Sequence, residues 1–311
     1  RDLARLVGRA GTGVAGLVEH THHGVTERVY GVLNVATGGL ARPVHRAHDL
    51  ITRHTFFWVR HGLGGAAWAA QAIAGRVNRE GTCDLHHPRA QLALGILNGV
   101  TGDQLARQAS SLAISMSLRL DDADIPATPE GLAAAYPGGR DQIVVFVHGL
   151  VENERSWRFQ SRQRWGEPGS SYATRLAAES DWQPVLVRYN SGRPIEANAD
   201  ALAELLDELV GHWPVPVRRL VVVGHSMGGL IALRAVAHGK PIWTRQVRAV
   251  VTIGSPREGA PLERFAASAE QIAERSGHGR WFSGLVGLRS DGIRDLRHPI
   301  AHPPLPEWVQ E

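Results

Sequence analysis

The spacing of apolar residues changes along the chain near residue 112. Before that point apolar positions recur at helical intervals, as at residues 3–17, 48–78 and 92–100, and no long strand-like alternation occurs. After it, short apolar runs alternate with helical segments, which is typical of a parallel sheet with crossover helices. The pattern therefore predicts a helical N-terminal region over residues 1–110 and an α/β domain over residues 111–311.

Continuous runs of Val, Ile and Leu in the second region indicate strands that are buried on both faces. The predicted strands lie at residues 114–120, 143–147, 184–189, 219–223 and 247–253. The predicted helices lie at residues 171–179, 196–210 and 227–238. After residue 253 the alternation stops. A helix-like piece at residues 262–275 and Gly/Pro-rich connections follow, without a recognisable strand.

The composition excludes several classes of protein. Of 311 residues, 43% are hydrophobic and 21% are charged, which is typical of a soluble globular chain. The net charge of +4 comes almost entirely from arginines that are spread along the sequence, so we expect no nucleic-acid partner. Cys83 is the only cysteine, which excludes an intrachain disulfide.

The sequence shows neither an evident signal peptide nor a run of about 18 apolar residues. We therefore expect a cytoplasmic protein. The apolar helical region leaves open an association with a membrane surface through peripheral contact, although packing of those helices on the core explains it equally well.

One pentapeptide carries the candidate chemistry. Gly224, His225, Ser226, Met227 and Gly228 fit the G-x-S-x-G pattern of a nucleophile elbow, where a serine sits on a sharp turn from a strand into a helix. The pattern alone is weak. Here a predicted strand precedes it and a predicted helix follows it, so we identify Ser226 as the candidate nucleophile.

A second motif follows the predicted strand at residues 143–147. His148, Gly149 and Leu150 form a short loop that lies beside the elbow if the two strands are neighbours in the sheet. A backbone N–H of this loop and that of Met227 would then form an oxyanion hole for a tetrahedral intermediate. The alternative is a plain glycine turn in which His148 only packs.

Several segments together resemble a known family. The segments FVHGL (146–150), GHSMGG (224–229) and TIGSP (252–256), with RYNSG (188–192) and SDGIRDL (290–296), resemble the bacterial lipase and esterase branch of the α/β-hydrolases. They are also similar to the hydrolase domain of the inositol deacylases that act on GPI anchors. The resemblance covers about residues 112–300. It implies an α/β-hydrolase fold with a mostly parallel sheet, and a lid that begins after residue 256.

The resemblance also implies an activity. The expected reaction is cleavage of a carboxylic ester, with a small-molecule or lipid-like substrate, through an acyl-enzyme on Ser226. Leu150 and Met227 would supply the oxyanion donors. Neither a cofactor nor a metal is expected. The histidines at positions 20, 22, 23, 86 and 87 have no acidic or cysteine partners at ligand spacing.

The chain departs from the family pattern after residue 253. A serine of this kind needs an acid and then a histidine, which follow after two further strands. The downstream histidines are at positions 238, 278, 298 and 302, and Asp291 and Asp295 are candidate acids by position only. We expect a chain truncated before the last strands, consistent with its start at Arg1, and therefore little turnover by these residues alone.

Three interpretations stay open at this stage. The first is the ester hydrolase. The second is a non-catalytic interaction protein on the same fold, a degenerate hydrolase that keeps the elbow without a triad. The third is an acyltransferase that uses the same nucleophile and passes the acyl group to an alcohol.

Overall fold

The computed structural model describes residues 88–158, 161–239, 241–257 and 290–296, together with positions 305, 307 and 309. The helices predicted at residues 3–17 and 48–78, the piece at residues 262–275 and the N-terminal histidines lie outside this range. The division of the chain at residue 110 and the absence of final strands stay predictions.

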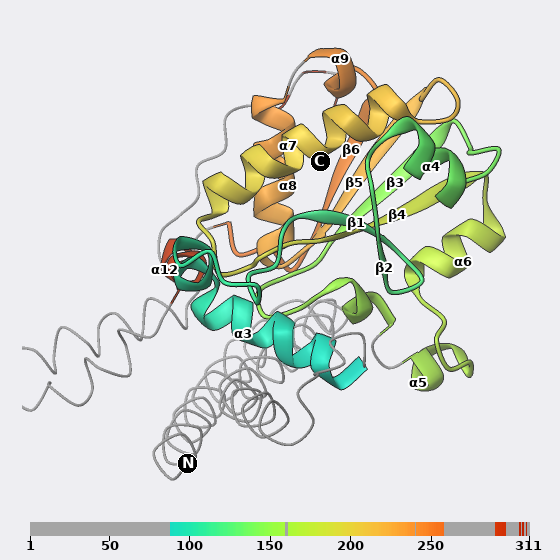
Figure 1. Cartoon of the computed structure of the whole chain (residues 1–311). Helices are drawn as coiled ribbons and strands as arrows, with labels where there is room; N and C mark the ends of the chain where they lie inside the picture. Colours follow the sequence, from blue (N-terminus) through green and yellow to red (C-terminus); the bar gives the residue numbers. More distant parts are fainter. Residues whose placement is uncertain are drawn as a thin grey trace, which may run out of the picture.

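A six-stranded sheet organises the molecule, with the strand order β2-β1-β4-β3-β5-β6 (Figure 1). The strands are β1 (Ser117–Leu120), β2 (Ala123–Ile125), β3 (Gln142–Val147), β4 (Trp182–Arg188), β5 (Arg219–His225) and β6 (Val247–Ile253). Strands β4, β3, β5 and β6 run parallel, and β1 is antiparallel to both of its neighbours. The predicted mostly parallel α/β sheet is therefore confirmed.

Helices lie on both faces of this sheet. They are α3 (Pro88–Arg107), α4 (Pro129–Ala135), the 3-10 helix η1 (Glu154–Arg158), α5 (Ser161–Trp165), α6 (Tyr172–Glu179), α7 (Ile195–His212), α8 (Met227–His238), α9 (Pro241–Thr244) and α12 (Asp291–Asp295). Helices α7 and α8 pack together over one face, while α6 packs against β4 on the other (Figure 1). Helix α12 lies against α3.

Local sequence patterns located most of these elements. The predicted helix at 227–238 and the predicted strand at 247–253 match α8 and β6 to the residue. The helix predicted at 171–179 begins one residue later, because Ser171 is its N-cap and forms a capping box with Thr174. Strand β1 is three residues shorter than predicted, since the Ile114 N–H donates to the Asn98 side chain instead.

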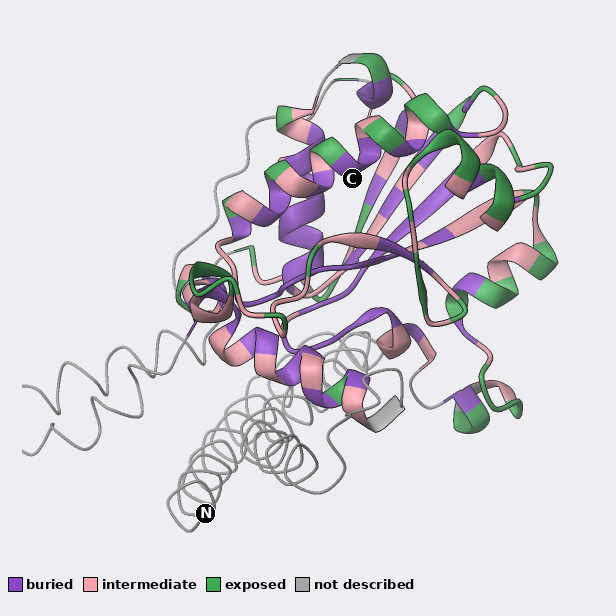
Figure 2. Ribbon diagram, viewed as in Figure 1, coloured by how far each residue is buried: buried purple, intermediate pink, exposed green. Residues whose placement is uncertain are grey.

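The core is divided by the sheet, and β3 contributes to both halves. Ile143, Val145 and Val147 point to the side covered by α7 and α8, where the main cluster of buried residues lies. Val144 and Phe146 point to the other side and pack with Trp157 and Ala173. The continuous apolar run of this strand is therefore buried on both faces, as predicted (Figure 2).

Helix α3 packs closely on two loops that follow strands of the sheet. A Cβ atom at Gly99 would lie 2.4 Å from Cγ1 and 2.8 Å from Cα of Val151. At Gly102 it would lie 1.9 Å from Oδ1 of Asn190. Glycine at these positions lets the helix backbone approach the loops after β3 and β4. Although α3 falls within the N-terminal region of the sequence, it is thus packed against the α/β domain.

No helix within the described ranges is both long enough and apolar enough to cross a lipid bilayer.

We expect Gly99→Ala to destabilise the protein even though alanine favours helices. The gain in helix propensity is about 1 kcal/mol, but the new methyl group must displace the backbone of Val151, and overpacking typically costs about 1–3 kcal/mol. Gly211→Ala in α7 is the matched control, because a Cβ there meets open space and should stabilise. Urea unfolding of both variants checks the prediction, and equal effects would contradict it.

Candidate active site

The turn between β5 and α8 has the geometry of a nucleophile elbow. Ser226 stands between the two elements with φ 51° and ψ −122°, in a region that non-glycine residues rarely occupy. Such a conformation costs on the order of 1–3 kcal/mol and persists only where the surroundings enforce it. Here the Ser226 N–H donates to the carbonyl oxygen of Ile253 at 2.8 Å, which fixes the turn to the end of β6.

The two glycines of the motif are required by close backbone approaches. A Cβ atom at Gly224 would lie 2.4 Å from N and Cα of Gly229, across the turn. At Gly228 it would lie 2.3 Å from the carbonyl oxygen of His148 and 2.4 Å from that of Val147. No side chain fits at either position, so the spacing of the motif has a direct steric cause.

The loop after β3 lies beside the elbow, as the sequence analysis required. Strands β3 and β5 are parallel neighbours, with Val147 paired to Gly224. A Cβ atom at Gly149 would lie 3.2 Å from Cβ of Ser226. The predicted oxyanion donors, Leu150 and Met227, therefore belong to two backbone segments that meet at the candidate nucleophile.

Both candidate donors carry a backbone N–H with no hydrogen-bond acceptor among the described residues. Met227 is the first residue of α8, where the N–H groups of the first turn have no partner within the helix and the helix dipole favours negative charge. Leu150 lies in a turn closed by the Glu152 N–H donating to the Gly149 carbonyl oxygen at 3.4 Å. Two such donors can stabilise an oxyanion.

The turn that contains Leu150 is strained. Val151 has φ 56°, an unusual value for a β-branched residue. Its N–H donates to Oγ of Ser191 at 3.0 Å, which anchors the turn to the loop after β4. Positive φ at this position and not at Leu150 corresponds to a type II turn.

His148 is buried and acts as a packing residue of the loop. Its ring stacks on Tyr189 with centroids 4.2 Å apart, and Nε2 accepts the Tyr189 N–H at 3.3 Å. Nδ1 therefore carries the proton and donates to the Gly149 carbonyl oxygen at 2.9 Å. Burial lowers the pKa of His148 to about 4, so the ring is neutral near pH 7.

His225 is paired with a carboxylate that the sequence analysis missed. Nδ1 of His225 lies 3.0 Å from Oε2 of Glu152, and the same oxygen accepts the Gly149 N–H at 2.8 Å. Burial alone would lower the pKa of His225, but the charge and the hydrogen bond of Glu152 outweigh it and raise that pKa. Glu152 follows the loop motif by two residues, and no local pattern distinguishes it from a surface glutamate.

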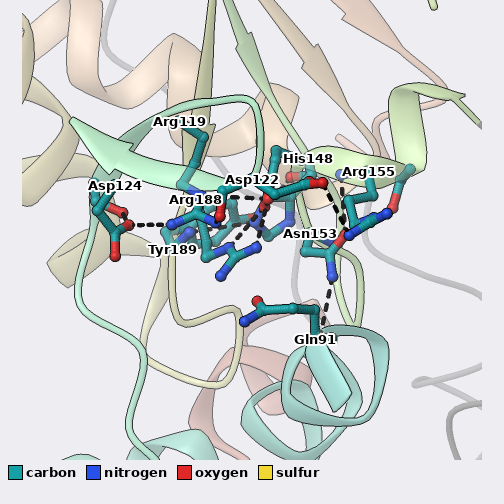
Figure 3. A network of polar contacts seen from close by, with 12 residues as sticks. Gln91, Arg119, Asp122, Asp124, His148, Asn153, Arg155, Arg188 and Tyr189 are labelled. Atoms are coloured by element: carbon teal, nitrogen blue, oxygen red, sulfur yellow. Dashed lines mark hydrogen bonds and ion pairs between the residues drawn. The ribbon is translucent and has the colours of Figure 1, made fainter. Parts of the chain in front are cut away.

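A buried ionic network holds the next part of the same loop (Figure 3). Glu154 accepts from Arg188 through both carboxylate oxygens, with Nε 2.7 Å from Oε2, and from Nε of Arg119 at 3.3 Å. Arg119 also pairs with Asp124 at 2.6 Å. Burial alone would raise the pKa of Glu154, but the hydrogen bond and charge of Arg188, with the charge of Arg119, lower it.

Asp291 and Asp295, the candidate acids, have structural partners. Oδ2 of Asp295 accepts the Ile195 N–H at 2.7 Å, at the start of α7. Oδ2 of Asp291 lies 3.0 Å from Arg107 of α3. His238 ends α8, where it lies near Glu196. The histidines at positions 278, 298 and 302 lie outside the described residues, and no hydrogen bond joins a histidine to Oγ of Ser226 in the part described.

Two other features lie away from the elbow. A cavity of about 310 Å³ is lined by Gln142, Arg218, Arg219 and Arg248, at the opposite ends of β3 and β5. Ligand atoms of Glu196, Asp200 and His238 lie within 4.8 Å of one another, but all three residues are exposed. Arg234 already pairs with Glu196, and its positive charge opposes a cation there.

A model of the alpha/beta hydrolase family matches residues 144–310, more than half of the chain. The chain has no match among proteins of curated function.

Solved structures that this chain matches include an esterase of Pyrococcus furiosus, at 15% identity over 50% of this chain and 54% of that one, with a TM-score of 0.32. They also include a lipase-esterase related protein of Clostridium acetobutylicum, at 16% identity over 55% and 69%, with a TM-score of 0.30. The bottromycin epimerase BotH matches at 17% identity over 50% and 62%, with a TM-score of 0.28. The chain thus spans less than two thirds of the esterase and of the epimerase.

We expect Glu154→Gln to lower the free energy of unfolding by about 3 kcal/mol near pH 7, because it leaves two buried guanidinium groups without a full counter-charge. Glu204→Gln, at an exposed position on α7, is the control.

The contribution of Glu154 to stability should also depend on pH. The folded-state pKa of Glu154 is lowered, so this contribution is complete above the ordinary glutamate pKa of about 4.3 and is lost as pH falls through the folded value. Urea unfolding between pH 3 and 7 checks both statements. A difference in the free energy of unfolding between wild type and Glu154→Gln that does not shrink as pH falls would contradict the expected pH dependence.

Proposed function

This chain belongs to the alpha/beta hydrolase family, and we propose that it is a serine hydrolase that cleaves carboxylic esters through an acyl-enzyme on Ser226. The observation that supports this most is the backbone of Ser226 itself. A strained serine at a strand-to-helix turn lies beside two N–H groups that have no acceptor among the described residues, and strain of this kind clusters at functional sites.

The proposed reaction has two steps. Oγ of Ser226 attacks the ester carbonyl carbon and its proton passes to a general base, while the carbonyl oxygen becomes negative and accepts the N–H groups of Leu150 and Met227. Collapse of this intermediate expels the alcohol, which takes up the proton, and leaves the acyl group on Ser226. Water then attacks the acyl-enzyme through a second oxyanion and releases the acid.

The base is not His148 or His225. His148 is neutral, buried and bonded through both ring nitrogens. His225 donates from Nδ1 to Glu152, and among the described residues no hydrogen bond joins its ring to Oγ of Ser226. We place the base outside the described ranges, in keeping with the order of acid and then histidine that this family uses after the serine.

The substrate is proposed to be a lipid-like ester. Support comes from the resemblance of the segments at residues 146–150, 224–229 and 252–256 to bacterial lipases, and the proposal extends to peripheral contact with a lipid surface. Transfer of the acyl group to an alcohol would use the same acyl-enzyme. Acid as the sole product in the presence of added alcohols supports hydrolysis, and an ester product supports transfer.

We expect the full-length protein to be labelled by a fluorophosphonate probe at Ser226, because the probe reacts only with an activated serine. Ser226→Ala should abolish the labelling. Ser255→Ala is the matched control, because Oγ of Ser255 is buried without a hydrogen-bond partner in the part of the chain that the structure describes, and its removal should leave the site intact. Gel fluorescence and peptide mass spectrometry measure the result. Absent labelling, or labelling that survives Ser226→Ala, would favour the non-catalytic interaction protein.

We expect Leu150→Pro to lower kcat for ester hydrolysis by about 10²- to 10³-fold, the usual effect of removing one oxyanion donor. Proline has no N–H, and its fixed φ suits the second position of a type II turn, so the loop should keep its shape. Leu150→Ala keeps the N–H and should retain kcat within a few-fold. Hydrolysis of p-nitrophenyl butyrate by both variants gives the comparison, and similar rates would remove Leu150 from the oxyanion hole.

A further inference from the structure

Glu152 lies between the two halves of the candidate active site. Its Oε2 accepts the Gly149 N–H at 2.8 Å and lies 3.0 Å from Nδ1 of His225. The side chain is only 3% exposed. Hydrogen bonds to a carboxylate in such surroundings are stronger than neutral ones and are little weakened by solvent.

The two partners of Glu152 belong to different segments. Gly149 precedes Leu150, one of the proposed oxyanion donors, in the loop after β3. His225 precedes Ser226, the proposed nucleophile, at the end of β5. A carboxylate that binds both segments links the oxyanion loop to the elbow, one residue away from each functional group.

Gly149 shows how little free space this junction has. A Cβ atom built on it would lie 3.1 Å from Nδ1 of His225, 3.2 Å from Oε2 of Glu152 and 3.2 Å from Cβ of Ser226. Three groups converge on one backbone carbon. The position of the loop relative to Ser226 is therefore set here, and a displacement of about 1 Å in an active site can cost 10²-fold in rate.

The loop also needs a restraint. Val151 is held at φ 56°, a conformation that a β-branched residue leaves unless its surroundings enforce it. One restraint is the Val151 N–H bonded to Oγ of Ser191. The carboxylate of Glu152 supplies another on the opposite side of Leu150, through the Gly149 N–H.

We propose that Glu152 is a positioning residue, which holds the Leu150 N–H at Ser226 by hydrogen bonding to Gly149 and His225 together. The inference rests on the proposed function. Glu152 acts through the backbone and does not touch the substrate, and its bond with His225 occupies the Nδ1 proton of that ring. The hydrogen-bond acceptor is the property that matters, so a neutral acceptor of the same shape should replace it.

The test compares Glu152→Met with Glu152→Gln in the full-length protein. Glutamine keeps an oxygen that can accept from both partners, whereas methionine has a similar shape and no such oxygen. We expect kcat for p-nitrophenyl butyrate to fall about 30- to 100-fold in Glu152→Met with KM changed less than threefold, and to stay within about fivefold in Glu152→Gln. Glu204→Met, an exposed glutamate on α7, is the matched control and should leave both parameters unchanged.

Two further measurements separate a loss of positioning by Glu152 from a loss of folded protein and from a failure of the proposed function. Rates are expressed per fluorophosphonate-reactive site, so loss of folded protein does not imitate loss of kcat. Hydrogen–deuterium exchange of residues 148–153 should rise in Glu152→Met and not in Glu152→Gln, and this is measured whether or not the protein hydrolyses esters.

A wild-type protein that is inactive and is not labelled by the fluorophosphonate would overturn the proposed function. Hydrogen–deuterium exchange of residues 148–153 would still decide whether Glu152 positions the loop. If the wild type is labelled, three results would overturn the role of Glu152. These are an unchanged kcat in Glu152→Met, a change in KM alone in that variant, and an equal loss of kcat in Glu152→Met and Glu152→Gln.

Discussion

The parallel pairing of β3 with β5 is the constraint on which the rest of the candidate site depends. Its register places Val147 opposite Gly224, so that both strands end at one edge and their loops leave side by side. The backbones then approach so closely that Gly228 has no room for a Cβ atom against the carbonyl oxygen of His148. A shift of register would separate the serine from the loop that carries Leu150.

This arrangement concentrates backbone strain at two neighbouring points. Ser226 and Val151 both have positive φ, each at a cost on the order of 1–3 kcal/mol. Hydrogen bonds to residues outside the two turns offset this cost. The carbonyl oxygen of Ile253 accepts the Ser226 N–H, and the hydroxyl of Ser191 accepts the Val151 N–H.

Two buried carboxylates hold the loop after β3 in place. Glu152 binds the elbow, and two residues later Glu154 binds Arg119 of β1 and Arg188 of β4. Ion pairs of this kind contribute little net stability compared with apolar packing, but removing one partner is costly. Both arginines of this network come from strands of the sheet, so Glu154 connects the loop to β1 and β4. Helix α3 also packs against this loop, where Gly99 contacts Val151.

Local patterns in the sequence determined the elements and the elbow. The apolar runs located β3, β5 and β6, and the five residues around Ser226, with a predicted strand before them and a predicted helix after them, identified the turn. Strand burial and the steric demands of that turn act over a few neighbouring residues. Only the tertiary structure decided the partners of the loop. Glu152 meets His225 across 73 positions and Glu154 meets Arg188 across 34, and α3 contacts a loop some 50 residues away. Such pairs leave no periodic trace in one sequence, since they arise from strand order and register, which are set by the whole chain.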